Sequence, residues 1–369
     1  MTAEVPLAAG SATAPSAAFD VALLDLDGVV YVGPDAVPGV PQALAAARAG
    51  GMRLGFVTNN AARTPEEVAR HLVELEVPAR PADVITSSQA AATVVAEMLG
   101  TGARVLPVGG PGVATALRAA ELAVVDRAED EPAAVVQGYG REVGWAQLAE
   151  AIVSIRAGAL HIATNTDATI PSPRGPLPGN GAMVGVVSAI TGRRPLVTGK
   201  PDPAMHAECV RRTGAQRPLV VGDRLDTDIE GARRGGAASL LVLTGVTDPV
   251  TLLAAPPEHR PDLLAPDAGG LLVLHPPVRV EATGTRCGGW AARFADAEEA
   301  LVLDAGQTPA ADADADADGD GLDGLRALCV AHWSRHPDEG TAVQVRAADD
   351  RARAALEEWE LVPASPAEG

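Results

Sequence analysis

Residues 21–31 read Val-Ala-Leu-Leu-Asp-Leu-Asp-Gly-Val-Val-Tyr, and this stretch decides the fold. The run is apolar and short, which is typical of one buried strand in a parallel sheet. Residues two apart on an extended chain point to the same side, so we expect Asp25 and Asp27 to project together, with Gly28 allowing a tight turn behind them. Open α/β sheets bind ligands at the carboxyl ends of their strands, so these carboxylates are predicted to face a crevice.

The two aspartates also indicate a metal. Neighbouring carboxylates repel each other unless a cation offsets their charge, and hard oxygen ligands of this kind suit Mg²⁺. A strand that simply ends in an Asx-Gly turn would also explain Asp27 and Gly28, so this stretch alone leaves both interpretations open.

Length and composition limit the class of protein. A chain of 369 residues is long enough for two or three domains. It has no apolar run of the roughly 18 residues that a membrane helix needs, and its Ala-rich start lacks the basic residues of a secretory signal. Three scattered cysteines fit a reducing compartment. We therefore expect a cytoplasmic protein with a disordered leader at residues 1–18.

Charge argues against two kinds of partner. The net charge is −19, so no broad basic face is available for nucleic acid or an anionic membrane. A small phosphorylated metabolite can still bind at one local cation. Lys200 is the only lysine in a chain that otherwise uses arginine, which indicates a site that needs a compact point charge.

The order of predicted elements divides the chain into domains. The fold class is α/β: a doubly wound, Rossmann-like parallel sheet, an inserted α/β cap and a small α+β C-terminal domain. The core is expected at residues 19–84 and 196–276, the cap at 85–195 and the accessory domain at 278–369. Within the last, residues 311–321 form an acidic segment of low complexity, expected to be a flexible linker.

Further polar residues follow other predicted strands. Thr58 and Asn59 follow a predicted strand at residues 52–57, and Asp223 follows another at 219–222. A phosphoryl group needs a nucleophile, hydroxyl and amide donors, a cation and a carboxylate-bound metal. Together with Asp25 and Lys200, these residues supply each part.

These motifs resemble the haloacid dehalogenase superfamily of phosphatases over residues 20–275. Thr58-Asn59-Asn60, Thr198-Gly199-Lys200-Pro201 and residues 222–229 resemble its class IIA branch more narrowly, which includes p-nitrophenyl phosphatases and phosphoglycolate phosphatase. Residues 221–231 and 349–359 resemble bacterial glycerol-3-phosphate phosphatases that carry an acetyltransferase-like domain. No Gly/Arg-rich turn in the tail suits coenzyme A, so we expect no acetyl transfer.

The resemblance implies a role for each residue. Asp25 is the nucleophile that forms an aspartyl-phosphate, and Asp27 protonates the leaving alkoxide and then activates water. Mg²⁺ is held by Asp25, the Asp27 carbonyl and Asp223, with Asp228 as outer support. The residues implied to bind phosphate or substrate are Thr58, Asn59, Asn60, Lys200, Asn165, Asp167 and Asn180.

The expected activity is hydrolysis of a small phosphomonoester, with glycerol 3-phosphate as the preferred substrate. The alternatives are 2-phosphoglycolate or another small ester of the p-nitrophenyl phosphate type, a phosphotransferase, and a non-catalytic sensor of a phosphorylated ligand. Ile170 stands where vertebrate pyridoxal phosphatases carry a histidine, which argues against pyridoxal phosphate. Caps of this branch often pair subunits, so a homodimer through the cap is one alternative, and the sequence leaves the oligomeric state open.

Overall fold

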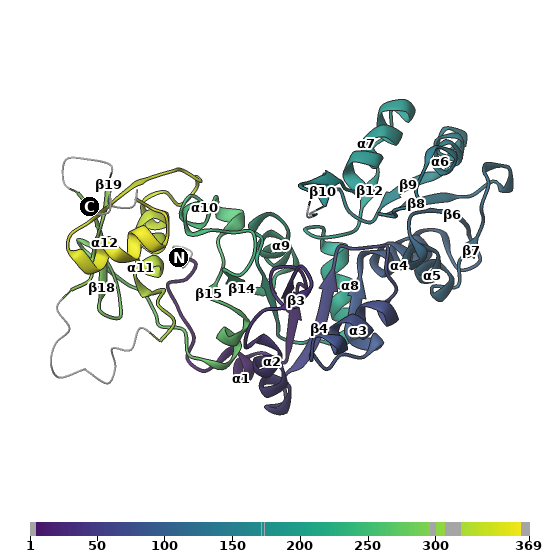
Figure 1. Ribbon diagram of the computed structural model, residues 1–369. Coiled ribbons are helices and arrows are strands. Elements are labelled where there is room, and N and C mark those ends of the chain that lie inside the picture. Colours follow the sequence, from purple (N-terminus) through teal and green to yellow (C-terminus); the bar gives the residue numbers. More distant parts are fainter. Residues whose placement is uncertain (1–4, 171, 173, 296–299, 307–318, 363–369) are drawn as a thin grey trace. The chain divides into compact units, whose positions relative to one another are not determined.

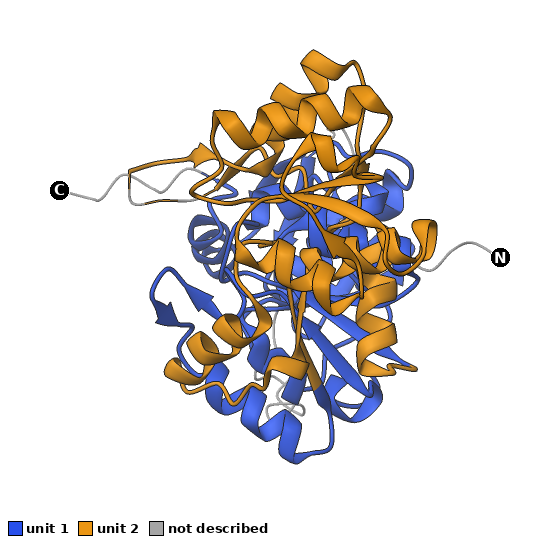
Figure 2. Cartoon of the chain, turned by 90° about the vertical axis from the view of Figure 1, so that its right-hand side faces the viewer, with its two compact units in different colours: residues 1–53, 217–369 blue, residues 54–216 orange. Residues whose placement is uncertain are grey.

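The computed structural model describes residues 5–170, 172, 174–295, 300–306 and 319–362, and Figure 1 labels its elements. Contacts divide the chain into unit 1, residues 1–53 and 217–369, and unit 2, residues 54–216 (Figure 2). The core and cap boundaries predicted from the sequence stay a prediction.

Unit 1 contains four parallel strands in the order β15-β14-β13-β1. All residues of β1 are buried, as expected for an apolar central strand. The strands are β1 (Val21–Leu24), β13 (Pro218–Gly222), β14 (Ala238–Val242) and β15 (Leu263–Ala265), with a hairpin of β2 (Tyr31–Val32) and β3 (Asp35–Ala36). The helical elements are α1 (Pro15–Ala18), α2 (Val40–Ala49), η3 (Leu225–Ile229, a π-helical turn), α9 (Glu230–Gly235), α10 (Pro249–Leu253), η4 (Pro257–His259) and η5 (Ala268–Leu272).

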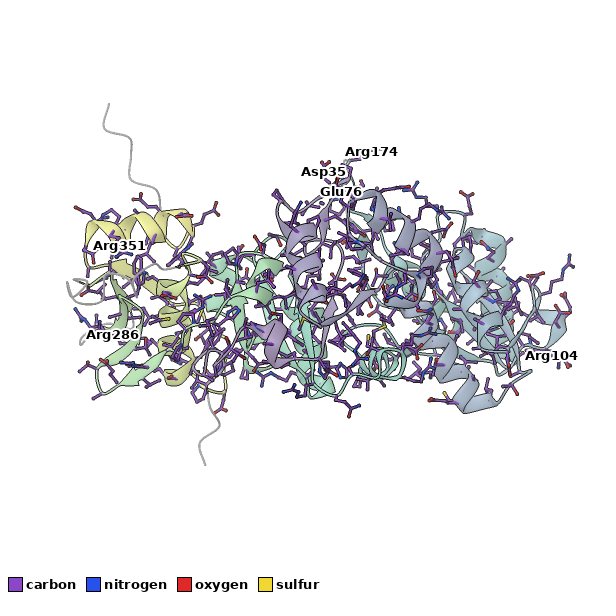
Figure 3. The ribbon with its side chains drawn as sticks, turned by 90° about the horizontal axis from the view of Figure 1, so that it is seen from below. Asp35, Glu76, Arg104, Arg174, Arg286 and Arg351 are labelled. Carbon is purple, nitrogen blue, oxygen red and sulfur yellow. The ribbon has the colours of Figure 1, made fainter. Side chains whose placement is uncertain are left out.

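The rest of unit 1 is a C-terminal module with its own sheet. Its strands are β16 (Arg279–Glu281), β17 (Gly284–Cys287), β18 (Trp290–Phe294), β19 (Ala300–Asp304) and β20 (Gln344–Ala347), with helices α11 (Asp323–Arg335) and α12 (Asp350–Glu358). Neighbouring strands are antiparallel except for β19 and β20, which are parallel and joined through α11. Exposed cations such as Arg286 and Arg351 lie on its surface (Figure 3).

The module and the parallel sheet share one hydrophobic core. Leu241 and Leu264 of the parallel sheet belong to the same buried cluster as Leu328 and Trp333 of α11. Residues 323–333 of α11 are all buried, which is unusual for a helix of a small domain and shows that it is covered on several sides.

The N-terminal segment differs from the expected disordered leader. Leu7 is only 3% exposed and belongs to that same core. Ala8 O accepts a hydrogen bond from Val278 N at 2.9 Å, and Ser11 N donates to His275 O at 2.8 Å. The prediction is therefore wrong for residues 5–18, because local composition does not reveal partners more than 260 residues away; residues 1–4 lie outside the described residues.

The predicted acidic linker is only partly described. Residues 311–318 lie outside the described residues. Asp320, at its end, instead forms an ion pair with Arg326, whose side chain is 2% exposed. Burial alone would raise the pKa of Asp320, but the hydrogen bonds and charge of Arg326 hold it below its ordinary value. The end of the segment is thus fixed by charge, where a flexible linker was expected.

Unit 2 begins with the parallel pair β4 (Arg53–Thr58) and β5 (Val84–Thr86) and continues into a five-stranded parallel sheet in the order β12-β9-β8-β6-β7. Helices α4 and α5 cover one face of that sheet, and α6 and α7 cover the other (Figure 1). The further strands are β6 (Arg104–Val108), β7 (Ala123–Val124), β8 (Ala134–Gln137), β9 (Leu160–Ala163), β12 (Leu196–Val197) and the hairpin of β10 (Thr169–Ile170) with β11 (Leu177–Pro178). The helical elements are α3 (Pro65–Glu74), η1 (Pro81–Asp83), α4 (Ser87–Leu99), α5 (Pro111–Ala119), η2 (Ala128–Asp130), α6 (Trp145–Ala157), α7 (Asn180–Thr191) and α8 (Pro203–Thr213).

These observations confirm the predicted fold class of parallel α/β sheets with a separate, mainly antiparallel C-terminal sheet. Within the described part of the chain, no helix combines the length and the apolar character needed to cross a membrane.

Candidate active site

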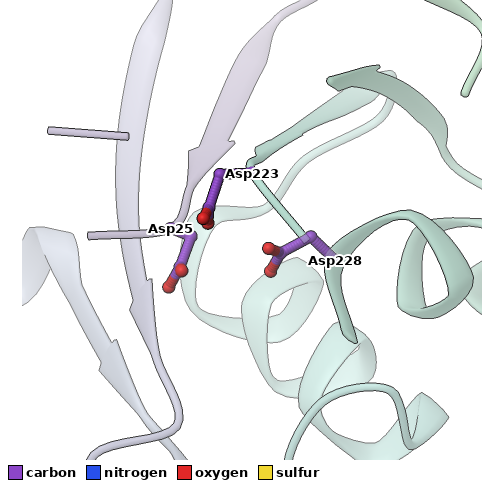
Figure 4. Close-up of side chains that lie close together, drawn as sticks. All are labelled: Asp25, Asp223 and Asp228. Carbon is purple, nitrogen blue, oxygen red and sulfur yellow. The ribbon is translucent and has the colours of Figure 1, made fainter. Parts of the chain in front are cut away.

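Three aspartates meet at the ends of two neighbouring strands in unit 1. The register pairs Leu24 of β1 with Val221 of β13, so Asp25 and Asp223 follow adjacent strand ends. Asp228 lies on η3, shortly after β13. One carboxylate oxygen from each of Asp25, Asp223 and Asp228 lies within 4.8 Å of the other two (Figure 4). The structure thus brings together three of the acidic residues that the sequence singled out.

Backbone groups hold two of these carboxylates in place. Asp223 Oδ2 accepts a hydrogen bond from Val246 N at 2.7 Å, and Asp228 Oδ2 accepts one from Arg224 N at 3.2 Å. Asp223 and Asp228 are each only 1% exposed. Donors of this kind stabilise the charged form of a buried carboxylate and fix its orientation.

Three glycines lie so close to these carboxylates that a side chain at any of the three positions would collide with them. A Cβ atom on Gly245 would lie 2.0 Å from Asp223 Oδ2, and one on Gly28 would lie 2.5 Å from the same oxygen. A Cβ atom on Gly222 would lie 2.1 Å from the Cβ of Asp228. The close approach of the backbone therefore requires glycine at these positions, and Gly28 also has a positive φ of 84°.

Asp27 is placed differently from its neighbour. β1 ends at Leu24, and the chain turns at once, with Gly28 N donating to Tyr31 O at 2.8 Å. The Asp27 side chain is exposed and is not part of the three-carboxylate cluster found among the described residues. The expectation that Asp25 and Asp27 project to the same side stays a prediction.

The carboxylate cluster fits a hard divalent cation. Three carboxylates this close repel one another, and two of them are almost fully buried, so a cation that binds all three lowers the free energy of the site. Carboxylate oxygen is the ligand that Mg²⁺ and Ca²⁺ prefer. Asp228, which was expected to support the metal from outside, lies within the same 4.8 Å limit as Asp25 and Asp223 and is therefore also a candidate ligand.

Unit 2 brings together the predicted phosphate-binding residues around one asparagine. Asn59 follows β4, and its Oδ1 accepts from Lys200 N at 2.9 Å while its Nδ2 donates to Lys200 O at 3.1 Å. Its Nδ2 also lies 3.5 Å from Asp167 Oδ2. The side chain of Asn59 thus fixes the backbone of the only lysine in the chain.

Asn165 and Asn180 support that arrangement from inside unit 2. Asn165 Nδ2 donates to Asn59 O at 2.7 Å, and Asn180 Nδ2 donates to Asn165 O at 2.8 Å and to Gln137 O at 3.3 Å. Both side chains are buried, at 3% and 2% exposed. The sequence predicted that they bind substrate, but their burial and backbone partners fit a positioning role.

The loop of residues 58–61 is held by hydroxyl groups. Thr58 Oγ1 accepts from Asn60 N at 3.0 Å, and Asn60 Oδ1 accepts from Ala62 N at 2.9 Å. Ser87 and Ser88, at the start of α4, donate to Asn59 O at 2.7 Å and to Ala61 O at 2.9 Å. Sequence reasoning missed these two serines, although the capping-box pattern at residues 86–89 marks the helix that carries them.

Comparison with known proteins identifies the family. The chain is 43% identical to the D-glycerol 3-phosphate phosphatase of Mycobacterium tuberculosis over 345 residues, 93% of this chain and 94% of that relative. A family model for haloacid dehalogenase-like hydrolases matches residues 22–123, and a second HAD-hydrolase-like model matches residues 197–271. The chain belongs to the haloacid dehalogenase-like hydrolases. The resemblance inferred from the sequence is thereby confirmed.

Solved structures of haloacid dehalogenase-like hydrolases agree. A crystal structure of glycerol phosphate phosphatase from Mycobacterium tuberculosis in complex with magnesium superposes with a TM-score of 0.83 at 42% identity, covering 95% of this chain and 99% of that one. The structure of the p-nitrophenyl phosphatase from Archaeoglobus fulgidus superposes with a TM-score of 0.64 at 28% identity. The superposition covers 69% of this chain and 98% of that one.

The C-terminal module matches a different family. A model for a GCN5-related N-acetyltransferase-like domain covers residues 287–361, which begin in β17 and end just beyond α12. In this haloacid dehalogenase-like hydrolase, the module shares its core with the parallel sheet of unit 1.

Proposed function

We propose that this protein is a Mg²⁺-dependent phosphatase that hydrolyses glycerol 3-phosphate to glycerol and phosphate. The cluster of Asp25, Asp223 and Asp228 at adjacent strand ends carries the proposal, because it joins a nucleophile to a cation site. The glycerol 3-phosphate phosphatase of Mycobacterium tuberculosis, 43% identical over 93% of this chain, supports the choice of substrate.

Asp25 and Asp27 perform the two halves of the reaction. An Asp25 carboxylate oxygen attacks phosphorus, which forms an aspartyl-phosphate and breaks the bond between phosphorus and the ester oxygen. Asp27 donates a proton to the departing alkoxide, then accepts one from the water that attacks the aspartyl-phosphate and regenerates Asp25. The exposed side chain of Asp27 supports a role in proton transfer more than one in metal binding.

The carboxylates of Asp25, Asp223 and Asp228, with the Asp27 carbonyl, would hold Mg²⁺. When bound, Mg²⁺ supplies positive charge that offsets the negative charge of the phosphoryl oxygens. The chain's own part is to keep these oxygens fixed before substrate arrives, which the backbone donors to Asp223 and Asp228 do.

Unit 2 supplies donors for the phosphoryl group. We assign the Lys200 ammonium and the Thr58 hydroxyl to the phosphoryl oxygens. Asn59 holds the backbone of Lys200, while Asn165 and Asn180 hold Asn59 in turn. The side chains of Asn60 and Asp167 shape the same loop region.

Initial rates of phosphate release test the proposal. We expect glycerol 3-phosphate to exceed 2-phosphoglycolate and p-nitrophenyl phosphate by at least roughly tenfold in kcat/KM, about 1.4 kcal/mol of transition-state preference. A chelator should abolish turnover. Asp25→Asn should remove activity, whereas Asp35→Asn, an exposed carboxylate on the β2-β3 hairpin, should retain it.

Other results would redirect the proposal. If 2-phosphoglycolate or a sugar phosphate has the highest kcat/KM, the proposed substrate changes but the enzyme class stays. A sugar phosphate is included because the acid sugar phosphatase of Staphylococcus aureus is 39% identical over 61% of this chain and 86% of that protein. If no ester is hydrolysed with Mg²⁺ present, the alternative of a phospholigand sensor replaces the proposal.

We also propose that the C-terminal module transfers no acetyl group. Its α11 follows β19 and leads into the parallel strand β20, and helix N-termini in such units bind anions. Here Asp320 Oδ1 accepts from Leu322 N at 3.1 Å at this end of the helix, and Arg326 binds both Asp320 and Asp323. These carboxylates leave the helix end unsuited to a pyrophosphate. Incubation with acetyl-coenzyme A and amine substrates should release no free thiol.

The proposed setting is the cytoplasm, with a free metabolite as substrate and no nucleic acid or membrane partner. The net charge of −19 supports the expected absence of nucleic-acid and anionic-membrane partners. A homodimer through the cap is supported by exposed apolar side chains on α6 and α7, with Trp145 87% and Ile190 56% exposed. Comparing the sedimentation coefficient of wild type with that of Trp145→Glu tests whether the protein forms a dimer through this surface.

A further inference from the structure

Arg260 is a buried cation held by the C-terminal module. It follows η4, is 3% exposed, and donates to four backbone carbonyls. One bond goes to Ala255 O at 3.1 Å within its own segment. The others go to His336 O at 2.8 Å, Pro337 O at 3.0 Å and Glu339 O at 2.7 Å, all just beyond the end of α11. The module thus surrounds this cation with carbonyl oxygens.

Trp333 completes the environment of Arg260. The guanidinium carbon lies 5.4 Å from the centre of its ring, and the Trp333 Nε1 donates to Leu253 O of α10 at 3.1 Å. A cation near the C-terminus of α11 is also favoured by the helix dipole. Burial lowers the pKa of Arg260 from its ordinary value. In the folded chain, these contacts offset the cost of burying the charged guanidinium.

The same segment contacts the helix that follows the carboxylate cluster. Arg233 of α9 donates through Nη2 to Arg260 O at 3.0 Å. His259, the last residue of η4, lies with its Nε2 3.1 Å from Oε2 of Glu230. Glu230 is the first residue of α9 and directly follows η3, which carries Asp228. Two polar contacts therefore join residues 259–260 to the segment that positions Asp228.

Apolar packing reinforces this link. Leu225 and Ile229, at the two ends of η3, belong to the buried cluster that includes Trp333 of α11. A π-helical turn is rare and persists only where its surroundings hold it. The surroundings of η3 include the C-terminal module.

We propose that Arg260 is a positioning residue of the metal site, through which the C-terminal module holds η3 and the Asp228 carboxylate in their metal-binding arrangement. The module is then a working part of the phosphatase although none of its residues belongs to the carboxylate cluster. The inference rests on the proposed function, because it takes that cluster as the Mg²⁺ site.

Direct measurement of Mg²⁺ binding tests this inference. Calorimetric titration of the full-length protein, well below its unfolding temperature, should give a Kd for Arg260→Met that is raised roughly three- to tenfold over wild type. The matched control is Arg335→Met, which removes an exposed arginine of α11 that also stacks on an aromatic ring, Phe294, at 4.4 Å. Its Kd should equal that of wild type.

A second variant covers the case in which Arg260→Met does not fold. His259→Ala removes only the contact with Glu230 from a side chain that is 23% exposed, and should raise the Kd roughly twofold or more with little change in Tm. If the folded variants bind Mg²⁺ as wild type does and lose only Tm, the inference is overturned and the proposed function stands. If wild type binds no Mg²⁺, both are overturned.

Discussion

At the scale of single residues, the space beside Asp223 is limited by Gly245. A Cβ atom there would lie 2.0 Å from Asp223 Oδ2, so Gly245→Ala must displace the carboxylate. Displacements of about 1 Å in an active site cost on the order of 100-fold in rate, and we expect kcat/KM to fall by about that factor. Gly185→Ala is the matched control, because nothing lies within 4 Å of its Cβ position on α7. It should keep activity and gain about 0.5–1 kcal/mol in free energy of unfolding.

His161 of unit 2 gives a pH dependence of stability. Its Nε2 lies 3.0 Å from Gln137 Oε1, and burial lowers its pKa from 6.5 to about 4. The unfolded chain takes up a proton on this histidine near pH 6.5, whereas the folded chain does so only near pH 4. The stability that the buried, neutral imidazole contributes is therefore complete above pH 6.5 and is lost as the pH falls toward 4. Between about pH 7.5 and 5, the free energy of unfolding of wild type should fall by about 1–2 kcal/mol more than that of His161→Gln. Urea denaturation at both pH values measures the free energy of unfolding. The control His71→Gln on α3 should lose as much of this free energy between the two pH values as wild type does. If His161→Gln also loses as much as wild type, the burial of His161 is not the cause.

Single residues also show how far sequence reasoning reaches. Asp25 and Asp223 could each be placed at a strand end because an apolar run followed by aspartate marks both positions, whereas the pairing of the two strands is known only from the structure. The burial of Asn165 and Asn180 could not be predicted, because it depends on carbonyls supplied by distant strands and loops.

At the scale of elements, local signals predicted well where they were strong. Thr64-Pro65-Glu66-Glu67 is a capping-box pattern with proline at the first helical position, which marks the start of α3, and both hydrogen bonds of the capping box are present. α4 and α7 were not predicted, although α4 opens with its own capping box at Thr86 and Gln89. Their Ala, Gly and Val residues give little contrast between a buried and an exposed face, so periodicity is weak there.

The capping box of α3 allows a quantitative test. Thr64 Oγ1 accepts from Glu67 N at 3.3 Å, and Thr64 N donates to Glu67 Oε2 at 2.8 Å. Thr64→Ala should lower the free energy of unfolding by about 1 kcal/mol without changing kcat/KM below the unfolding transition. Thr64→Ser retains the hydroxyl and should match wild type in urea denaturation. A lower kcat/KM in folded Thr64→Ala would contradict the prediction, because it would show that the capping box of α3 affects the active site as well as stability.

At the scale of the whole molecule, the separate C-terminal sheet was predictable, but the core that it shares with the parallel sheet was not. The composition of residues 278–369 marks a separate domain, yet residues 323–333 of α11 are all buried, and several of them share a core with residues of the parallel sheet. Leu7 enters the same core from the other end of the chain. Such contacts join residues hundreds of positions apart, and a single sequence gives no measure of them.

The division of labour between the two units leads to a final prediction. The proposed metal ligands, Asp25, Asp223 and Asp228, belong to unit 1, whereas the proposed phosphate donors, Thr58 and Lys200, belong to unit 2. Mg²⁺ alone should therefore slow amide hydrogen exchange at residues 24–28 and 222–229, because binding suppresses local opening of the segments that hold the ion. Addition of orthovanadate, which imitates the phosphoryl group, should extend protection to residues 58–60 and 198–200.

Variants make this experiment decisive. Asp223→Asn should lose the Mg²⁺-dependent protection in unit 1, because one carboxylate of the cluster becomes neutral. Asp35→Asn, on the exposed β2-β3 hairpin of the same unit, should keep it. Protection of unit 2 by Mg²⁺ alone would contradict the assignment of the metal to the unit 1 carboxylates. Protection of neither unit by vanadate would contradict the assignment of Thr58 and Lys200, since a bound oxyanion must order the groups that donate to it.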